Sequence, residues 1–324
     1  MPAPLVNDIR SDRRFGCNFL RVLLFIAILF VFDLFISLVL LKGIERFYGL
    51  GSDADVLMIG HSHLMLAVDK VALEEESGLR VARYTREGVN MADRRVMAQQ
   101  YFDICSGPPE TVILSIDPWL FSGEGLSLNS WKLFLPFMDD KGVNYYVKSS
   151  AKKFDYYRYK VVRSGRFNAQ LLNASARGWL RNWDNLKFGV VDTVRYNNEE
   201  ALRGFRPITF SRELMDDFAS TLDFLNSENV RVLLLNTPVW EPLIAAQRVE
   251  YDRSMFLIDS IAWVHCPGAE IIDLVQEFAH RTELFFDPIH MNPEGQRVVT
   301  KAVSEFLRQE LDQSPPSPGS KSRI

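Results

Sequence analysis

Cysteine is scarce in this chain, with three residues among 324, which excludes a small fold held together by disulfide bonds. Cys105 and Cys266 each precede an expected strand and could pair in an oxidising compartment. We expect two buried free thiols instead, because the strands that they precede are not expected to be neighbours. None of the three has a nearby residue that suggests metal binding or nucleophilic chemistry.

The chain also lacks an excess of basic charge. Its formal net charge is -4, from 37 Lys and Arg against 41 Asp and Glu. Nucleic-acid-binding domains usually present a basic face or a high isoelectric point, so we expect no nucleic-acid partner. With 47% hydrophobic residues the chain can bury one full core, and we expect a single domain of enzyme size.

Only one stretch is apolar over a long distance. Residues 22–41, VLLFIAILFVFDLFISLVLL, can cross the hydrocarbon core of a bilayer, about 30 Å, as a helix. The stretch is too long for the core of a cleaved signal peptide, and no small-residue cleavage site follows it. We therefore expect a retained transmembrane signal anchor rather than a removed leader or the buried helix of a soluble protein.

Charges on the two sides of this stretch predict its orientation. Arginine is concentrated before it, at Arg10, Arg13, Arg14 and Arg21, whereas Lys42 and Arg46 follow it. The positive-inside rule then makes residues 1–21 a cytoplasmic tail and places the following domain on the periplasmic or extracellular side of the cytoplasmic membrane. Residues 42–54 form a short tether, which keeps that domain close to the membrane lipid.

Asp33 lies near the middle of the expected span. An ionisable side chain is costly in lipid and usually faces a protein partner or a polar cavity. One interpretation is therefore that Asp33 faces a partner helix within the membrane. The other is a protonated or snorkelling carboxyl group that a single-pass anchor tolerates.

Beyond the anchor, short apolar runs alternate with helix-like segments. Five runs predict strands, at residues 56–59, 81–84, 111–116, 230–235 and 270–274. This alternation predicts an α/β fold over residues 55–311, with a flavodoxin-like, doubly wound parallel sheet. A last helix begins after Asn292, with Pro293 at its first position. The Pro- and Ser-rich residues 312–324 predict a disordered tail.

Residues 120–207 form an insertion that the alternation does not explain. The insertion is rich in bases and aromatic side chains: Lys148, Lys152, Lys153, Arg158, Lys160, Arg163, Arg166, Arg177, Arg181, Tyr145, Tyr146, Tyr156, Tyr157, Tyr159, Trp179 and Trp183. One interpretation is a lid that contacts anionic lipid headgroups or a polymer. The other is an ordinary solvated helical subdomain with its own aromatic core.

Polar residues follow several expected strands. Ser62 comes after the first strand, Gly88 and Asn90 after the second, and Asp117 after the third. Ligands of open α/β sheets bind beyond the carboxyl ends of the strands, so we expect these residues to converge there.

Three residue types in this set suit acyl-transfer chemistry. Serine is a weak nucleophile at neutral pH, so it needs an imidazole to take its proton and a carboxylate to hold that imidazole in one tautomer. Ser62 can be the nucleophile, and Asp287 and His290 near the C-terminus can supply the carboxylate and the imidazole. The order of these residues predicts a Ser-His-Asp active site.

The chain resembles the SGNH (GDSL-like) hydrolase superfamily at three motifs, Gly60-His61-Ser62, Gly88-Val89-Asn90 and Asp287-Pro288-Ile289-His290. The likeness is closest to membrane-tethered members that face the cell envelope. It implies that Ser62 is the nucleophile, that His290 is the general base and then acid, and that Asp287 orients the imidazole. It also implies that the backbone N–H groups of Ser62 and Gly88 face the oxyanion.

The third sequence block departs from the family pattern. Members often have Gly-x-Asn-Asp there, whereas this chain has Ser115-Ile116-Asp117-Pro118-Trp119. An ionised Asp117 cannot donate a hydrogen bond, so Asn90, Trp119 or another amide completes the oxyanion hole, or the site takes a different acyl acceptor. The predicted oxyanion and substrate residues are thus Gly88, Asn90, Asp117 and Trp119.

His61 and His63 flank Ser62 and, with His290, could be taken for zinc ligands. Neighbours of a residue in an extended turn point away from the side that it faces. We therefore expect His61 and His63 to pack behind the serine or to contact substrate, and we expect no metal and no cofactor.

The resemblance implies a membrane-anchored serine acyltransferase or esterase that acts on O-acyl groups of an extracytoplasmic polysaccharide or related glycopolymer. Such relatives often work beside a multi-pass membrane-bound O-acyltransferase, which would be the protein partner. The alternative, suggested by the altered third block, is a non-catalytic scaffold subunit of a membrane assembly. Transfer and hydrolysis share an acyl-serine intermediate, so the sequence does not separate them.

Overall fold

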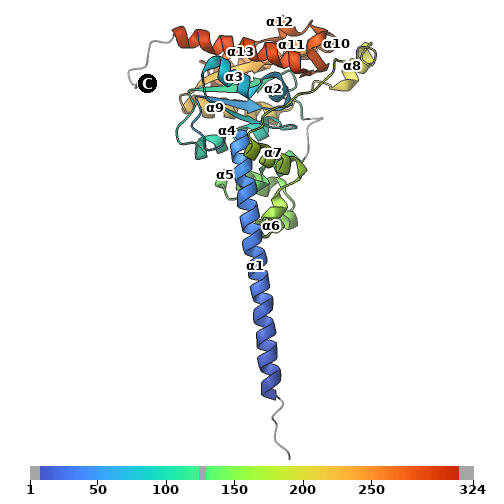
Figure 1. The fold of residues 1–324 in the computed structure, drawn as a ribbon. Helices are drawn as coiled ribbons and strands as arrows, with labels where there is room; N and C mark the ends of the chain where they lie inside the picture. The colour runs from blue at the N-terminus through green and yellow to red at the C-terminus, as the bar shows by residue number, and fades with distance from the viewer. Residues whose placement is uncertain (1–7, 124–128, 314–324) are drawn as a thin grey trace, which may run out of the picture.

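The computed structural model describes residues 8–123 and 129–313 and shows an α/β domain on one long helix (Figure 1). The tail predicted for residues 312–324 lies outside the described residues, except that Asp312 and Gln313 continue the last helix. The first seven residues of the predicted cytoplasmic tail also lie outside them.

Five parallel strands form the central sheet in the order β2-β1-β3-β4-β5. They are β1 (Val56–Gly60), β2 (Val81–Thr85), β3 (Thr111–Ile116), β4 (Arg231–Asn236) and β5 (Glu270–Asp273). Every residue of β1, β2 and β3 is buried, as expected for a parallel sheet covered on both faces. The predicted flavodoxin-like, doubly wound sheet is confirmed.

Helices cover both faces of the sheet, and the core is divided accordingly. One face is covered by α4 (Met91–Ile104), α9 (Arg212–Ser227) and most of α11 (Arg248–His265). The other is covered by α2 (Ser62–Ala67), α3 (Lys70–Ser77), α10 (Glu241–Ala246), α12 (Val275–Phe278) and α13 (Pro293–Gln313). The last helix begins at Pro293 as predicted, because the side-chain oxygen of Asn292 accepts the N–H of Gly295 at 3.0 Å.

Helix α1 (Asp8–Tyr48) is a single helix of 41 residues, and its part from Phe19 to Tyr48 is long and apolar enough to cross a membrane. The structure differs from the predicted tether, because the helix continues to Tyr48 and buries Ile44, Phe47 and Tyr48 in the domain core. These apolar side chains continue the helix beyond its exposed apolar part, so α1 enters the domain without a flexible link.

Two glycines allow α1 to pack closely on α7 (Ala169–Leu180). A Cβ atom at Gly43 would lie 2.4 Å from the carbonyl oxygen of Ser175, and one at Gly178 would lie 1.8 Å from the carbonyl oxygen of Gly43. The two backbones therefore touch at a crossing that no larger residue fits.

Asp33 contacts the insertion of its own chain, an arrangement that the sequence did not predict. Its carboxylate accepts hydrogen bonds from the backbone N–H groups of Arg163 at 2.8 Å and Ser164 at 2.9 Å, and the Ser164 hydroxyl also donates to it. Asp33 thus caps η2 (Ser164–Arg166), a short 3-10 helix of the insertion. Because these donors satisfy the carboxylate within the chain, Asp33 no longer suggests a partner helix.

The insertion is helical, and in its part from residue 129 to residue 207 the buried side chains join the two core clusters of the domain. Its helices are η1 (Ser130–Phe137), α5 (Lys141–Ser150), α6 (Lys153–Val161), η2, α7 and α8 (Glu199–Phe205). Buried residues such as Phe134 and Leu171 join the same cluster as Ile44 of α1. The indole N–H groups of Trp179 and Trp183 donate to carbonyl oxygens of α1, each at 3.0 Å. These two aromatic residues therefore hold the insertion against α1.

Cys105 and Cys266 are free thiols, as expected. They precede β3 and β5, which are separated by β4. Cys266 is buried, whereas Cys105 is half-buried.

Candidate active site

Ser62 lies at the turn from β1 into α2, at the carboxyl edge of the sheet. The strand ends at Gly60, His61 caps the helix, and Ser62 is its first residue. A Cβ atom at Gly60 would lie 2.6 Å from the Cβ atom of Ser115, so only glycine permits this direct turn. The sequence Gly-His-Ser therefore presents the serine at the edge of the sheet where ligands of such folds bind.

Asp287 and His290 lie on a tight hairpin between β6 (Phe285–Asp287) and β7 (His290–Met291). One carboxylate oxygen of Asp287 accepts the backbone N–H groups of Ile289 and His290, each at 3.0 Å. The other lies 2.8 Å from Nδ1 of His290. The aspartate thus closes its own turn and holds the imidazole from one side.

The hairpin brings His290 to the serine, although 228 positions separate them. Nε2 of His290 lies 2.9 Å from Oγ of Ser62. Because Nδ1 donates its proton to Asp287, Nε2 is the acceptor that faces the serine hydroxyl. The structure thus brings Ser62, His290 and Asp287 together in one series of hydrogen bonds, and this series can move a proton from the hydroxyl to the imidazole.

The carboxylate of Asp287 is held in its ionised form. Burial alone would raise its pKa, but hydrogen bonds from the His290 imidazole and from the N–H groups of Ile289 and His290 outweigh burial and keep the pKa below the usual value. An ionised Asp287 can stabilise the imidazolium that forms when His290 takes a proton.

His61 and His63 are both buried beside the serine. The imidazole of His63 meets that of His290 edge to face, with centroids 5.4 Å apart. Nε2 of His61 lies 2.9 Å from the carboxylate of Asp117, and its Nδ1 accepts the backbone N–H of His63 at 3.2 Å. His63 therefore supports the face of the His290 ring, and neither ring is exposed to contact substrate.

Asp117 and Trp119 do not lie where an oxyanion would bind, in contrast to the prediction. Asp117 is fully buried, and its carboxylate faces His61 and the N–H of Trp119. The indole N–H of Trp119 donates to the carbonyl oxygen of Arg206 at 2.9 Å. Burial would raise the pKa of Asp117, but the nearby His61, His63 and Arg94 hold it well below its usual value. The third block thus supplies a buried anion that stabilises the cluster behind the site.

The atoms of His61, His63 and Asp117 lie close enough together to ligate a metal ion. Two guanidinium groups adjoin this cluster, since Arg206 lies 3.2 Å from Nε2 of His63 and Arg94 lies 3.7 Å from the Asp117 carboxylate. The positive charges of both arginines disfavour a further cation, so we interpret the cluster as a hydrogen-bonded support.

Gly88 and Asn90 remain as candidate donors to an oxyanion. Gly88 has a φ of 74°, which favours glycine. Within residues 8–123 and 129–313, the backbone N–H groups of Ser62 and Gly88 have no hydrogen-bond acceptor. Asn90 accepts the N–H of Asp93 with its side-chain oxygen and so caps α4. Its side-chain nitrogen has no acceptor among these residues, so it is free to donate to a ligand.

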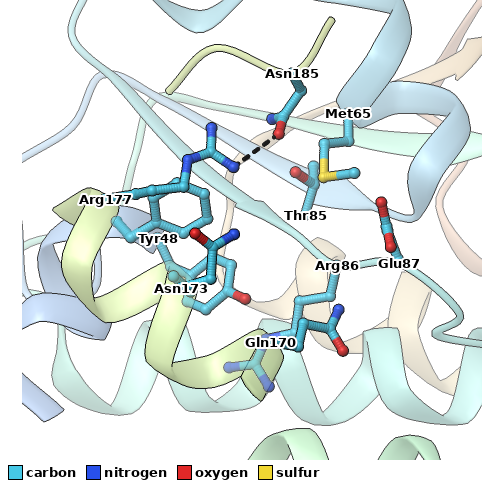
Figure 2. Close-up of a pocket in the computed structure, with 11 residues that line it drawn as sticks. Tyr48, Met65, Thr85, Arg86, Glu87, Gln170, Asn173, Arg177 and Asn185 are labelled. Atoms are coloured by element: carbon cyan, nitrogen blue, oxygen red, sulfur yellow. Dashed lines mark hydrogen bonds between the residues drawn. The ribbon is translucent and has the colours of Figure 1, made fainter. Parts of the chain in front are cut away.

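A cleft of about 100 Å³ adjoins the elements that carry Ser62 and Gly88. Figure 2 shows Gln170, Asn173 and Arg177 of α7 on one side, facing Met65 of α2 and Glu87, which precedes Gly88. Helix α7 of the insertion therefore lines this cleft with polar side chains next to α2, while Trp179 and Trp183 of the insertion bond to α1.

Two arginines of the site were missed by the sequence analysis. Arg94 lies on the buried side of α4, where its spacing from Met91 and Met97 places a charge on the apolar face and could have revealed a buried carboxylate partner. Arg206 contacts His63 and lies over the ring of Trp119 at 5.2 Å. No sequence pattern links Arg206 to these residues, because it arrives at the end of the insertion.

Stability is expected to fall as the pH drops from 7 to 5, because His61 is buried in its neutral form. Burial, reinforced by the charge of Arg94, lowers the pKa of His61 to about 4 against the opposing effect of Asp117. An unfolded imidazole has a pKa of about 6.5, so between these values the unfolded chain binds a proton that the folded chain does not, and acid favours unfolding. At pH 5, His61 alone should lower the free energy of unfolding by about 2 kcal/mol.

Thermal unfolding in detergent across this pH range checks the expectation. The variant His61→Asn keeps an acceptor for the helix cap and should show a flatter pH dependence. The control His265→Gln changes a half-buried imidazole outside this cluster and should retain the wild-type dependence. A wild-type unfolding temperature that is constant from pH 7 to pH 5 would contradict the assignment.

No protein-family model matches the sequence, and no curated protein matches it. Solved structures with a similar fold include a lipase from a goat rumen metagenome, at 9% identity over 77% of this chain and 95% of that one, with a TM-score of 0.38. A lipase/acylhydrolase from Enterococcus faecalis matches at 8% identity over 79% and 95%, with a TM-score of 0.40. A catalytic mutant of an acetylxylan esterase from Geobacillus stearothermophilus matches at 14% identity over 80% and 95%, with a TM-score of 0.40. At these values the likeness assigns neither a substrate nor an activity to this chain.

Proposed function

We propose that this chain is a membrane-anchored serine acyltransferase or esterase of the SGNH type. Its substrates are O-acyl groups of an extracytoplasmic polysaccharide or related glycopolymer, and its N-terminus is cytoplasmic. The observation that supports this function best is the series of contacts from Ser62 through His290 to Asp287 at the carboxyl edge of the sheet. The apolar helix that enters the domain directly supports the anchoring.

The reaction follows from the positions of these three side chains. Oγ of Ser62 attacks the ester carbonyl carbon while its proton moves to Nε2 of His290. The bond from this carbon to the alcohol oxygen then breaks, and the departing oxygen takes the proton from His290, which leaves an acyl-serine. A sugar hydroxyl or water attacks the acyl-serine, its proton moves to His290, and the Ser62 oxygen recovers that proton when it leaves.

The negative oxygen of each tetrahedral intermediate needs donors that are fixed in advance. The N–H groups of Ser62 and Gly88 and the side-chain nitrogen of Asn90 are the candidates. Loss of one such donor costs about 2.7 to 4 kcal/mol of transition-state stabilisation in comparable sites. Asn90 thus serves as the oxyanion donor that Asp117 of the third sequence block cannot provide.

The polar cleft supports a carbohydrate acceptor. Gln170 and Asn173 offer amide groups that can pair with sugar hydroxyls, and Glu87 offers a carboxylate on the other side. A multi-pass membrane-bound O-acyltransferase that supplies the acyl group remains part of this proposal, although Asp33 no longer points to it. The scaffold alternative loses its motivation, since the altered third block supports the histidines behind Ser62 and leaves the three-residue series intact.

A transfer assay tests the proposed reaction and separates its two forms. The full-length protein in detergent is given an activated acetyl ester, with or without a soluble glycan. We expect the glycan to accelerate acetyl release and to become acetylated, and Asn173→Ala to reduce only the glycan-dependent part. Release that no glycan affects would leave an esterase, and no Ser62-dependent release at all would overturn the function.

A further inference from the structure

The hydrogen bonds of Asp33 fix the depth of the insertion relative to the membrane helix. Asp33 lies eleven positions after Val22, about 16 Å along the helix at about 1.5 Å per residue, whereas the hydrocarbon core of a bilayer is about 30 Å thick. The N–H groups of Arg163 and Ser164 contact Asp33 directly. Exposed apolar residues of α1 continue past this contact to Val39, and the exposed Lys42 follows them. This part of the insertion therefore lies beside the apolar belt of the helix.

The insertion presents exposed apolar side chains at this depth. Helix α6 exposes Phe154 by 78%, Tyr157 by 57% and Val161 by 62%, and Val162 follows with 46%. The first three are spaced by three and four positions and so share one helix face. In Figure 1, α6 is the part of the domain that reaches furthest down α1. Large apolar side chains gathered in this way mark a contact surface rather than a solvated face.

Side chains that prefer a membrane–water boundary lie further along α1 and at the start of α6. The indole N–H of Trp179 donates to the carbonyl oxygen of Val39, and the guanidinium group of Arg46 lies 4.1 Å from the centroid of its ring. Tryptophan is enriched at such boundaries, and arginine and lysine interact there with anionic headgroups. Lys152 and Lys153, both exposed, adjoin the apolar face of α6 at its start.

We propose that residues 152–166 are embedded in the membrane leaflet on the side of the catalytic domain. Phe154, Tyr157, Val161 and Val162 contact the acyl chains, and Lys152 and Lys153 contact anionic headgroups; this surface therefore docks on a lipid bilayer. The inference depends on the membrane anchoring within the proposed function, and it is independent of the proposed chemistry.

Embedding would hold the polar cleft beside α2 at a set height. Tyr48 lines the cleft and lies nine positions beyond Val39, which is about 13 Å along the helix. Since α1 and α7 touch backbone to backbone, the domain cannot swing away from the bilayer on a flexible link. The site would then receive substrates that are presented just above the headgroups.

Depth-dependent fluorescence quenching tests the embedding. In the full-length protein with its native cysteines replaced by serine, an environment-sensitive dye is attached to Val161→Cys, to Phe25→Cys in α1 or to Phe256→Cys on α11. Phe256 is a matched control, because it is an exposed apolar residue at 69% on a helix far from α6 (Figure 1). The proteins are placed in vesicles of phosphatidylcholine and phosphatidylglycerol that carry an acyl-chain nitroxide quencher.

We expect the nitroxide to quench the dyes at residues 161 and 25 severalfold more strongly than the dye at residue 256, which iodide in the water should quench instead. Quenching at residue 25 without quenching at residue 161 would overturn the embedding of residues 152–166 and would still support membrane anchoring by α1. Protection of residue 161 from both quenchers would overturn it in favour of a protein partner. If residue 25 also escapes the nitroxide, the anchoring fails with the inference. Ester hydrolysis is measured separately, so none of these results depends on the proposed chemistry.

Discussion

Replacement of Ser62 with alanine should lower ester hydrolysis by about four to six powers of ten, as the removal of an attacking serine does in comparable sites. The serine hydroxyl is the group that contacts Nε2 of His290, at 2.9 Å. Without it, the imidazole has no nucleophile to activate. The measurements are the rate of hydrolysis of an activated acetyl ester and covalent labelling by a fluorophosphonate probe.

Two further variants complete this test. His290→Ala should also abolish labelling, because Ser62 would then lack its base. Ser52→Ala removes an exposed hydroxyl that bonds to the carbonyl oxygen of Gly49 and to Tyr101, away from the three-residue series, so it should leave both readouts unchanged. Hydrolysis or labelling of the Ser62→Ala protein within tenfold of the wild type would refute the assigned nucleophile.

Asp287→Asn should reduce kcat by about four powers of ten while the chain stays folded. Its side-chain amide would donate to Nδ1 of His290, where the carboxylate now accepts at 2.8 Å. The proton of the imidazole would then move to Nε2, which could no longer accept the serine proton. The kinetics of ester hydrolysis at neutral pH measure the loss.

The chain contains a matched control for this change. Asp223 lies 2.9 Å from Nδ1 of His265 on an exposed surface, which reproduces the aspartate–histidine contact without a serine. Asp223→Asn should therefore leave kcat unchanged. Equal losses in both variants would indicate a general effect on folding, and an active Asp287→Asn protein would mean that this carboxylate does not orient the base.

The third sequence block, residues 115–119, differs from the family pattern, yet the contacts from Ser62 through His290 to Asp287 are intact. The buried cluster beside these residues explains why. Asp117 is oriented toward His61 and the N–H of Trp119, with Arg94 nearby. Removal of one partner from such a buried group leaves charge uncompensated and typically costs about 3 to 5 kcal/mol. The block that departs from the family pattern thus contributes to the stability of the site.

The sequence by itself determined the sheet and the order of the candidate triad. The apolar runs at residues 56–59, 81–84 and 111–116 predicted buried parallel strands because such strands need continuous apolar sequence on both faces. Ser62 and Gly88 were found because ligand-binding residues follow strand ends in this class of fold. Asp287 and His290 were found because the carboxylate and the imidazole stand three positions apart in one motif.

Only the tertiary structure decided the placement of Asp33, Asp117 and the insertion. Their partners lie far away in sequence: Asp33 bonds to residues 130 and 131 positions later, and Trp183 to a carbonyl 136 positions earlier. Local sequence patterns show which residues are apolar and which turns they form. They do not show which distant group will form a hydrogen bond with a given polar side chain. Helix α1, the insertion and the sheet domain therefore pack as one unit through hydrogen bonds between residues that are far apart in the sequence.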